Sequence, residues 1–228
     1  IYLYVHFDQP LQQMELGRFR EMIKQRVKRI PVAYILGEKE FMGMDFSVSP
    51  AVLIPRPDTE ILVENVIERL KKLGNVHIVD IGTGSGAIAV SILANCLNVS
   101  GVAVDISSEA LAVAKSNAVR HGVDMRLEFV KSDVYDSLSA GQFDAIISNP
   151  PYIPDKDIAG LEPEVKREPY GALAGGKDGL DFYRRLIQEG IKFLKPNGFM
   201  AFEVGIYQAE DVADIGRQTG AFNHFEII

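Results

Sequence analysis

Cysteine is nearly absent from this chain. Its 228 residues include a single cysteine, Cys96, and one thiol cannot build an internal disulfide framework or a cysteine-based zinc site. The histidines His77, His121 and His224 are scattered and lack the paired spacing of metal ligands, so we expect no metal centre. Such sparing use of cysteine is typical of a reducing compartment and predicts a cytoplasmic location.

Positive charge is also in deficit, with 24 Lys and Arg residues against 31 Asp and Glu residues and a net charge of -7. A surface built to neutralise many phosphates would show the opposite balance. We therefore expect no direct nucleic-acid partner.

A long uninterrupted hydrophobic run is lacking as well. The most apolar stretch, residues 87–104, contains Ser91, Asn95 and Asn98, and we expect it to form a buried helix followed by a buried strand. The first ten residues, IYLYVHFDQP, lack the basic region and the cleavage site of a signal peptide. We see no targeting element and expect no membrane association.

From residue 76 onward, short β-rich runs alternate with helical stretches. Expected strands cover residues 76–81, 102–105, 127–130, 143–148, 200–204 and 222–228. Expected helices cover residues 86–97, 107–121, 180–194 and 208–218, with Ser107 as an N-cap and Gly122 as a stop signal. This alternation predicts an α/β fold with a doubly wound, mostly parallel sheet.

The first 75 residues predict a smaller cap or lid. A charged helical stretch over residues 11–29 precedes a small hairpin over residues 34–48, centred on Gly43. Three prolines then mark a turn, and a helix begins near Asp58 and Thr59, with apolar residues along one face.

The first strand-to-helix turn of the sheet reads VDIGTGSGA over residues 79–87. Its glycines allow a sharp turn and a close approach of a ligand, and the following helix directs its N–H dipoles at the site. Taken alone, this pattern is also a weak dinucleotide fingerprint.

Three acidic residues stand at the ends of consecutive predicted strands. Asp80 precedes the glycines, where it would repel a pyrophosphate but stabilise the ammonium of a methionine moiety. Asp105 can accept hydrogen bonds from both ribose hydroxyls. Asp133 can accept from an adenine amine, with Val134 against the ring. Each could instead be an ordinary strand-end or turn residue, but together they indicate a cofactor that contains adenosine without a diphosphate.

The predicted strand over residues 143–148 is followed by an unusual loop, NPPYIP, over residues 149–154. The adjacent prolines Pro150 and Pro151 remove two N–H donors and fix two φ angles, so the chain must leave the sheet as a stiff loop. Asn149 offers a side-chain oxygen, Pro150 a backbone carbonyl, and Tyr152 an aromatic wall. The Asn149 oxygen and the Pro150 carbonyl are both hydrogen-bond acceptors.

Together, DIGTGSG, Asp105 and the Asn-Pro-Pro-Tyr sequence resemble the class I S-adenosylmethionine-dependent amino-methyltransferases. The resemblance implies S-adenosylmethionine as cofactor and S-adenosylhomocysteine as product. It also implies that the Asn-Pro-Pro-Tyr segment binds a planar, weakly nucleophilic NH₂ group, whose two N–H bonds these acceptors can hold so that its nitrogen is oriented for attack. It implies that cofactor is bound by Asp80, Gly82, Thr83, Gly84, Ser85, Gly86, Asp105, Asp133, Val134 and Asn149. Catalysis is assigned to Asn149, Pro150 and Tyr152, and these residues also bind substrate together with Pro151.

A narrower resemblance covers most of the chain. Residues 29–31, 34–37, 40–43, Phe46 and the turn VLIPRPDTE over residues 52–60 are similar to the protein release factor glutamine methyltransferases of the PrmC/HemK type. Position 58 is aspartate where that family has glutamate. The resemblance implies that Arg56 and Glu60 bind substrate by shaping its channel.

This family resemblance also implies a substrate and a domain plan. The substrate is the side-chain nitrogen, N5, of the glutamine in the Gly-Gly-Gln loop of class-1 peptide-chain release factors. Residues 1–30 correspond to the remnant of an N-terminal helical domain, 31–57 to a β-hairpin linker or lid, and 58–228 to the methyltransferase domain. We expect a monomer whose partner is the release factor.

Three other functions stay open from the residues alone. An adenine N6-methyltransferase on DNA or RNA shares the Asn-Pro-Pro-Tyr logic, but it must flip a base and grip phosphates, for which this acidic chain shows no basic insert. The other two are a binding module that holds the cofactor or a ribosomal partner without turnover, and a nicotinamide oxidoreductase.

Overall fold

Five parallel strands form the centre of the fold. In the computed structural model, which describes residues 2–5, 7, 9–10, 12–140 and 142–228, they lie in the order β5-β4-β3-β6-β7. Their bounds are β3 (Val76–Ile81), β4 (Val99–Asp105), β5 (Leu127–Lys131), β6 (Phe143–Ser148) and β7 (Leu194–Phe202). The chain winds outward from β3 to β5 and then returns to β6 on the other side of β3. The predicted α/β doubly wound sheet is confirmed.

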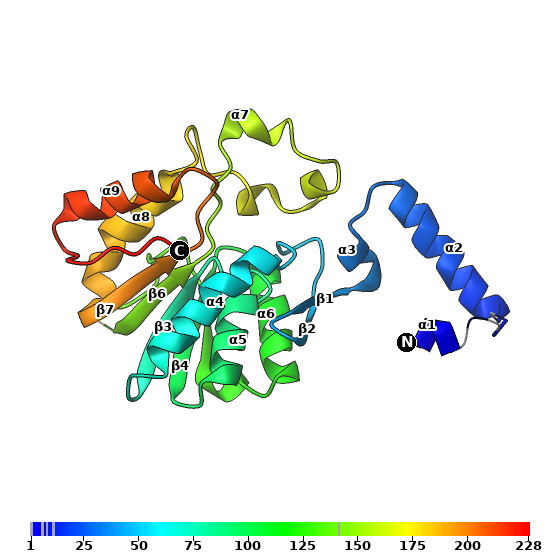
Figure 1. The fold of residues 1–228 in the computed structure, drawn as a ribbon, viewed down its shortest axis with the longest axis horizontal. Coiled ribbons are helices and arrows are strands. Elements are labelled where there is room, and N and C mark those ends of the chain that lie inside the picture. The colour runs from blue at the N-terminus through cyan, green and yellow to red at the C-terminus, as the bar shows by residue number, and fades with distance from the viewer. Residues whose placement is uncertain (1, 6, 8, 11, 141) are drawn as a thin grey trace.

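Helices cover both faces of this sheet (Figure 1). One face carries α4 (Pro57–Leu70), α5 (Ala87–Asn95) and α6 (Ser108–Arg120), and the other carries α8 (Asp181–Gly190) and α9 (Ala209–Thr219). Because β3 and β6 lie between the two helix layers, both strands are almost wholly buried. This explains why their sequences are continuous apolar runs.

Local signals in the sequence set the helix ends. Pro57 occupies the first turn of α4. The Ser107 hydroxyl accepts a hydrogen bond from the Ala110 N–H at 3.1 Å, and so caps α6 as predicted. Gly122 follows this helix with a φ of +67°, which glycine adopts without strain.

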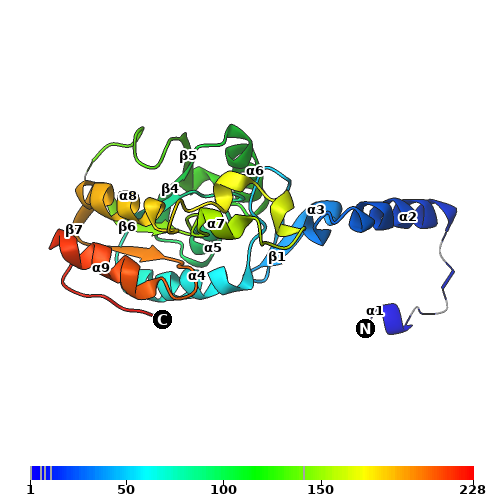
Figure 2. The same ribbon diagram turned by 90° about the horizontal axis from the view of Figure 1, so that it is seen from above.

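The N-terminal part consists of α1 (Tyr2–Val5), α2 (Gln13–Val27), α3 (Val32–Leu36) and an antiparallel hairpin of β1 (Glu38–Phe41) and β2 (Met44–Ser47). Figure 2 shows α2 extending away from the sheet, and α2 has no buried residue. The predicted helix and hairpin are confirmed, although Tyr34 lies in α3 and Leu11 lies outside the described residues. Phe41 and Phe46 join the same buried cluster as α4 and α5, so the hairpin is part of the core.

A long connection after β6 crosses the edge of the sheet where the strands end. It contains α7 (Asp155–Ile158) and two short 3-10 turns, Val165–Arg167 and Tyr170–Ala172. Further 3-10 turns, Asp124–Arg126 and Ile191–Phe193, precede β5 and β7.

Three strand predictions differ from the structure: one predicted strand is absent, and two begin earlier than predicted, β4 at Val99 and not at residue 102, and β7 at Leu194 and not at residue 200. The segment 222–228 forms no strand, because Phe222 and Phe225 pack against each other, with ring centroids 6.3 Å apart, and Phe225 also lies against α9 at Arg217. The strand β7 begins early because it includes Pro196, Asn197 and Gly198, which a register irregularity between β6 and β7 accommodates. No helix within the described part of the chain is long and apolar enough to cross a membrane.

Candidate active site

The carboxyl ends of the five parallel strands lie along one edge of the sheet. The strand order changes direction between β3 and β6, and such a switch point opens a crevice between the loops that follow the two strands. The Ser148 hydroxyl donates to the Ile81 carbonyl at 2.6 Å and so ties the ends of these strands together. The glycine loop, residues 82–86, and the Asn-Pro-Pro-Tyr loop, residues 149–152, therefore flank the same crevice.

The glycine loop has the conformation that its sequence predicts. Gly82, Gly84 and Gly86 have φ angles of +73°, +55° and +80°, in the left-handed region. At Gly86, a β-carbon would also lie 3.1 Å from the Ala114 side chain, so glycine allows α5 to pack closely against α6.

Asp105 holds the glycine loop and the start of α6 at the same time. Its Oδ2 accepts a hydrogen bond from the Gly84 N–H, and its Oδ1 accepts one from the Ser107 N–H, both at 2.9 Å. The carboxylate is half-buried, and each oxygen keeps capacity for a second donor. Its predicted role toward ribose hydroxyls fits this arrangement and stays a prediction.

Asp80 lies fully buried beneath the loop. Its Oδ2 accepts hydrogen bonds from the Thr83 hydroxyl at 2.7 Å and from the Ala89 N–H at 3.3 Å. Its Oδ1 has no partner among the described residues. Burial, with a smaller contribution from the charge of Asp105, raises the pKa of Asp80 to about 7. An unpartnered buried oxygen beneath a glycine loop fits a site that is completed by a bound donor.

Asp133 and Val134 follow β5. The Asp133 carboxylate is exposed and forms an ion pair with Arg185 of α8 at 2.8 Å. Val134 is buried and has a φ of +50°, which is strained for a β-branched residue. The predicted contacts of these two residues with adenine stay predictions.

The Asn-Pro-Pro-Tyr loop contacts two residues, Thr59 and Glu203, that the sequence analysis did not assign to the site. The Asn149 amide nitrogen donates to the Thr59 hydroxyl at 3.1 Å, and Thr59 donates to Glu203 Oε2 at 2.5 Å. The Tyr152 hydroxyl donates to Glu203 Oε1 at 3.2 Å. Glu203 directly follows β7, at the same edge as Asp80, and this position was the signal that could have identified it.

Burial has the largest effect on the pKa of Glu203 and on that of Tyr152. It raises the pKa of Glu203, while the hydrogen bonds from Thr59 and Tyr152 and the nearby Asn149 amide act in the opposite direction. Burial and the neighbouring Glu203 carboxylate raise the pKa of Tyr152 to about 12, so its hydroxyl stays a donor at neutral pH.

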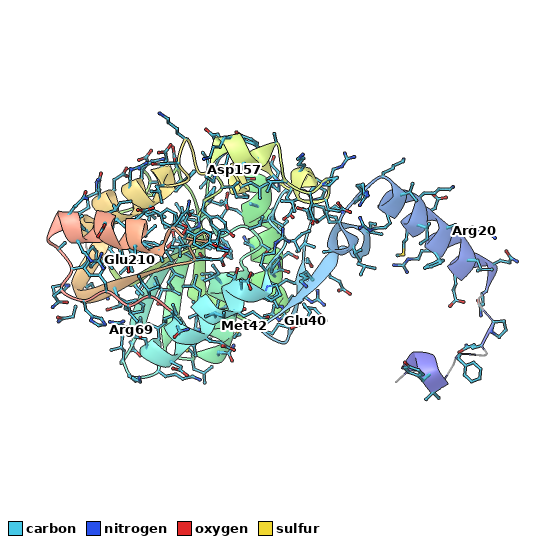
Figure 3. The ribbon with its side chains drawn as sticks, turned by 45° about the horizontal axis from the view of Figure 1, so that its top comes forward. Arg20, Glu40, Met42, Arg69, Asp157 and Glu210 are labelled. Carbon is cyan, nitrogen blue, oxygen red and sulfur yellow. The ribbon has the colours of Figure 1, made fainter. Side chains whose placement is uncertain are left out.

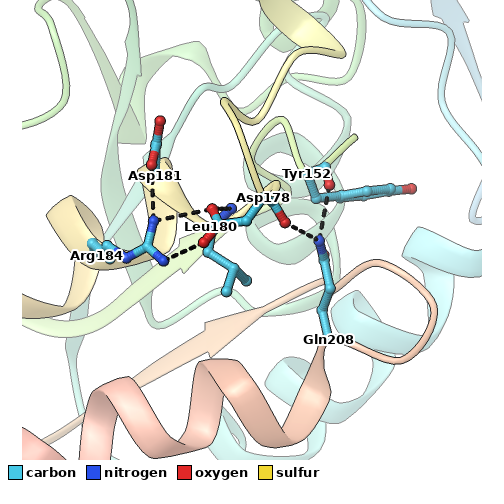
Figure 4. Close-up of polar contacts among 6 residues, drawn as sticks. All are labelled: Tyr152, Asp178, Leu180, Asp181, Arg184 and Gln208. Atoms are coloured by element: carbon cyan, nitrogen blue, oxygen red, sulfur yellow. Dashed lines mark hydrogen bonds and ion pairs between the residues drawn. The ribbon is translucent and has the colours of Figure 1, made fainter. Parts of the chain in front are cut away.

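Neighbouring loops clamp the Asn-Pro-Pro-Tyr loop from outside. Figure 4 shows Gln208 donating to the Tyr152 carbonyl at 3.0 Å and reaching the Asp178 carbonyl at 3.5 Å. The Gln208 side-chain oxygen accepts from the Gly205 N–H at 3.1 Å. On the other side, Ile153 forms a parallel bridge with Ala174.

Arg56 and Glu60, predicted to shape the substrate channel, have partners within the protein. Arg56 pairs with the buried Glu168, whose second oxygen accepts from the Ile54 N–H at 2.9 Å. Glu60 accepts from the N–H of Met42, in the hairpin turn beside α4 (Figure 3), at 2.7 Å. A role of either residue toward substrate stays a prediction.

Within the described residues, no group of three or more His, Cys, Asp or Glu side chains is arranged to hold a metal ion. A doubly wound sheet with a glycine loop and an Asn-Pro-Pro-Tyr loop on the two sides of its switch point is the arrangement that the sequence resemblance to class I methyltransferases led us to expect.

Comparisons with known proteins define the family. Models of the "Methyltransferase small domain" and of the "PrmC N-terminal domain" match residues 57–161 and 1–37. The release factor glutamine methyltransferase of Geobacter sulfurreducens is 45% identical over 96% of this chain and 76% of its own length. That of Moorella thermoacetica is 41% identical over 99% of this chain and 80% of its own length. The chain belongs to the release factor glutamine methyltransferase family.

A solved structure supports the fold. A methyltransferase from Pyrococcus furiosus superimposes with a TM-score of 0.58 at 23% identity, covering 86% of this chain and 88% of the other.

Proposed function

We propose that this protein transfers a methyl group from S-adenosylmethionine to the N5 nitrogen of the glutamine in the Gly-Gly-Gln loop of class-1 release factors. The observation that carries this proposal is the Asn-Pro-Pro-Tyr loop, which faces the glycine loop across the switch point of the sheet. The relatives named release factor glutamine methyltransferases support the choice of substrate.

The chain has the groups that S-adenosylmethionine needs. Asp80, the three glycines, Thr83 and Ser85 line the turn that would hold the methionine moiety, while Asp105 would accept from the ribose hydroxyls and Asp133 and Val134 would meet the adenine. When bound, this cofactor supplies an electrophilic methyl group on a sulfonium. The protein therefore has to supply mainly orientation.

Orientation of the glutamine amide falls to Asn149, Pro150 and Tyr152. The nitrogen lone pair of an amide is delocalised, so both N–H bonds must be held before the nitrogen can point its lone pair at the methyl group. The Asn149 side-chain oxygen accepts one N–H and the Pro150 carbonyl the other; within the described residues, no donor already bonds to that carbonyl. Pro151 stiffens the loop, and the Tyr152 ring forms the wall.

No general base is required for the transfer itself. The nitrogen becomes acidic once it carries the methyl group, and its proton then passes to water. The residues that hold the amide thus account for the chemistry without a nearby histidine.

A labelling experiment tests this proposal. Purified protein is incubated with tritiated S-adenosylmethionine and either unmethylated release factor or plasmid DNA. We expect label on release factor, none on a release factor whose Gly-Gly-Gln glutamine is changed to alanine, and a loss of at least about 100-fold in kcat for Asn149→Ala. Label on DNA alone, or an Asn149→Ala variant with nearly full activity, would overturn the proposal.

A further inference from the structure

The Thr59 hydroxyl lies between the amide nitrogen of Asn149 and a carboxylate oxygen of Glu203, at 3.1 and 2.5 Å. A hydroxyl has one proton to donate, and in the structure the Thr59 hydroxyl donates it to Glu203 Oε2. The Thr59 proton is therefore committed to Glu203, and Thr59 can only accept from the Asn149 NH₂ group. The direction of both hydrogen bonds is fixed.

This direction decides which way the Asn149 amide faces. Rotation of the amide by half a turn would place its oxygen against the Thr59 oxygen, so that two acceptors would meet in a site where Thr59 is 4% exposed. The observed orientation leaves the Asn149 oxygen free to accept an N–H from a substrate amide. In the flipped orientation, Asn149 would present its own NH₂ group, a donor, to the NH₂ group of the substrate, which is also a donor.

Glu203 is itself held in place from two sides. Its second oxygen accepts from the Tyr152 hydroxyl, and its backbone carbonyl accepts from the buried Tyr183 hydroxyl at 2.8 Å. Thr59 is in the first turn of α4, Glu203 at the end of β7 and Tyr183 in α8. Residues from three separate parts of the fold thus hold the Asn149 amide in one orientation.

We propose that Thr59 and Glu203 are positioning residues, which lock the Asn149 amide with its oxygen toward the substrate nitrogen. This inference rests on the proposed function. Neither residue touches the reacting atoms, and both act through Asn149.

The matched pair Thr59→Val and Thr59→Ser tests this arrangement. Valine has nearly the shape of threonine but no hydroxyl, whereas serine keeps the hydroxyl. We expect Thr59→Val to lower kcat for release-factor methylation about 10- to 100-fold with KM for S-adenosylmethionine within about twofold of wild type. Thr59→Ser should stay within about threefold of wild type in kcat.

A double-mutant cycle separates positioning from a general structural effect. If Thr59 acts through Asn149, Thr59→Val should cause almost no further loss in an Asn149→Ala background. Glu203→Gln provides a second route: its amide group can donate as well as accept, so kcat should fall while S-adenosylhomocysteine binding persists. This variant decides the question if Thr59→Val does not fold.

Equal kcat values for Thr59→Val and Thr59→Ser, or additive losses in the cycle, would overturn the positioning role while wild-type transfer to release factor remained. Absence of transfer by the wild-type protein would overturn the proposed function and this inference with it.

Discussion

The acidic residues at the carboxyl edge of the sheet differ in burial, and this difference predicts different roles for them. Asp105 is half-buried and keeps capacity for ligand donors, whereas Asp80 is fully buried with one unpartnered oxygen. The pKa of Asp80 is raised to about 7, so its charge changes near neutral pH. Between about pH 4 and pH 7, the folded free protein holds the proton of Asp80 more tightly than the unfolded chain does. The contribution of Asp80 to the free energy of unfolding therefore decreases as pH rises through this range.

Cofactor binding should follow the ionisation of Asp80. Because the ionised carboxylate attracts the ammonium of the cofactor, we expect the affinity for S-adenosylhomocysteine to increase by up to about tenfold between about pH 6 and pH 8. Isothermal titration calorimetry across this range measures the effect. The Asp80→Asn variant should bind more weakly and show a flatter pH dependence, and parallel slopes for the two proteins would contradict this role.

Glu168 gives a residue-scale prediction about stability. Its buried carboxylate accepts from the Ile54 N–H and pairs with Arg56, so Glu168→Ala leaves a buried donor without its partner. We expect the free energy of unfolding to fall by about 2–4 kcal/mol in chemical denaturation. Glu162→Ala, an exposed change in the same connection, is the control. Equal denaturation midpoints for Glu168→Ala and Glu162→Ala would show that the Glu168 contacts contribute little to the free energy of unfolding.

Among single residues, the sequence alone identified those site residues that belong to a short motif. The glycines, Asp80 and the Asn-Pro-Pro-Tyr loop are recognisable because neighbouring residues combine to make one pattern. Thr59 and Glu203 were missed because their partnership joins positions 144 residues apart. Only the fold brings α4 and the end of β7 together.

At the scale of elements, the connection after β6 is the part of the fold that shapes the site. It bridges back to the Asn-Pro-Pro-Tyr loop at Ile153 and Ala174, and Gln208 fastens the same loop from the segment before α9. Gly179 lies where these pieces meet, with a φ of +82°, and a β-carbon there would overlap the Tyr152 carbonyl and the Gln208 amide.

We therefore expect Gly179→Ala to displace the loop and lower kcat by at least about tenfold. Steady-state methylation of release factor measures this effect. Gly171→Ala is a matched control in the same connection, since no atom lies within 4 Å of a β-carbon at that position. Normal turnover by Gly179→Ala would show that the loop tolerates the displacement.

Element prediction succeeded where burial dominates and failed at an exposed end. The predicted bounds of β3 and β6 match the structure because both strands are apolar runs between two helix layers. The segment 222–228 has a similar apolar composition, but it packs against α9 instead of pairing with the sheet. Composition alone does not distinguish these two ways of covering an apolar side chain.

At the scale of the whole molecule, the sheet and its two helix layers form the catalytic body, and α2 lies apart from it. An ion-pair cluster links this helix to the connection after β6, because Arg26 and Arg29 both reach Glu164, at 2.7 and 3.1 Å. Since α2 buries no residue, the body owes little of its stability to it. The site is instead assembled by strands that meet at one edge of the sheet.

We expect this assembly to methylate a release-factor glutamine. The most direct test is mass spectrometry of unmethylated release factor after incubation with the protein and S-adenosylmethionine. We expect the mass of one added methyl group on the Gly-Gly-Gln peptide, with fragmentation placing it on the glutamine side chain. An unmodified peptide under conditions in which the protein binds S-adenosylhomocysteine, or a methyl group on another residue, would contradict it.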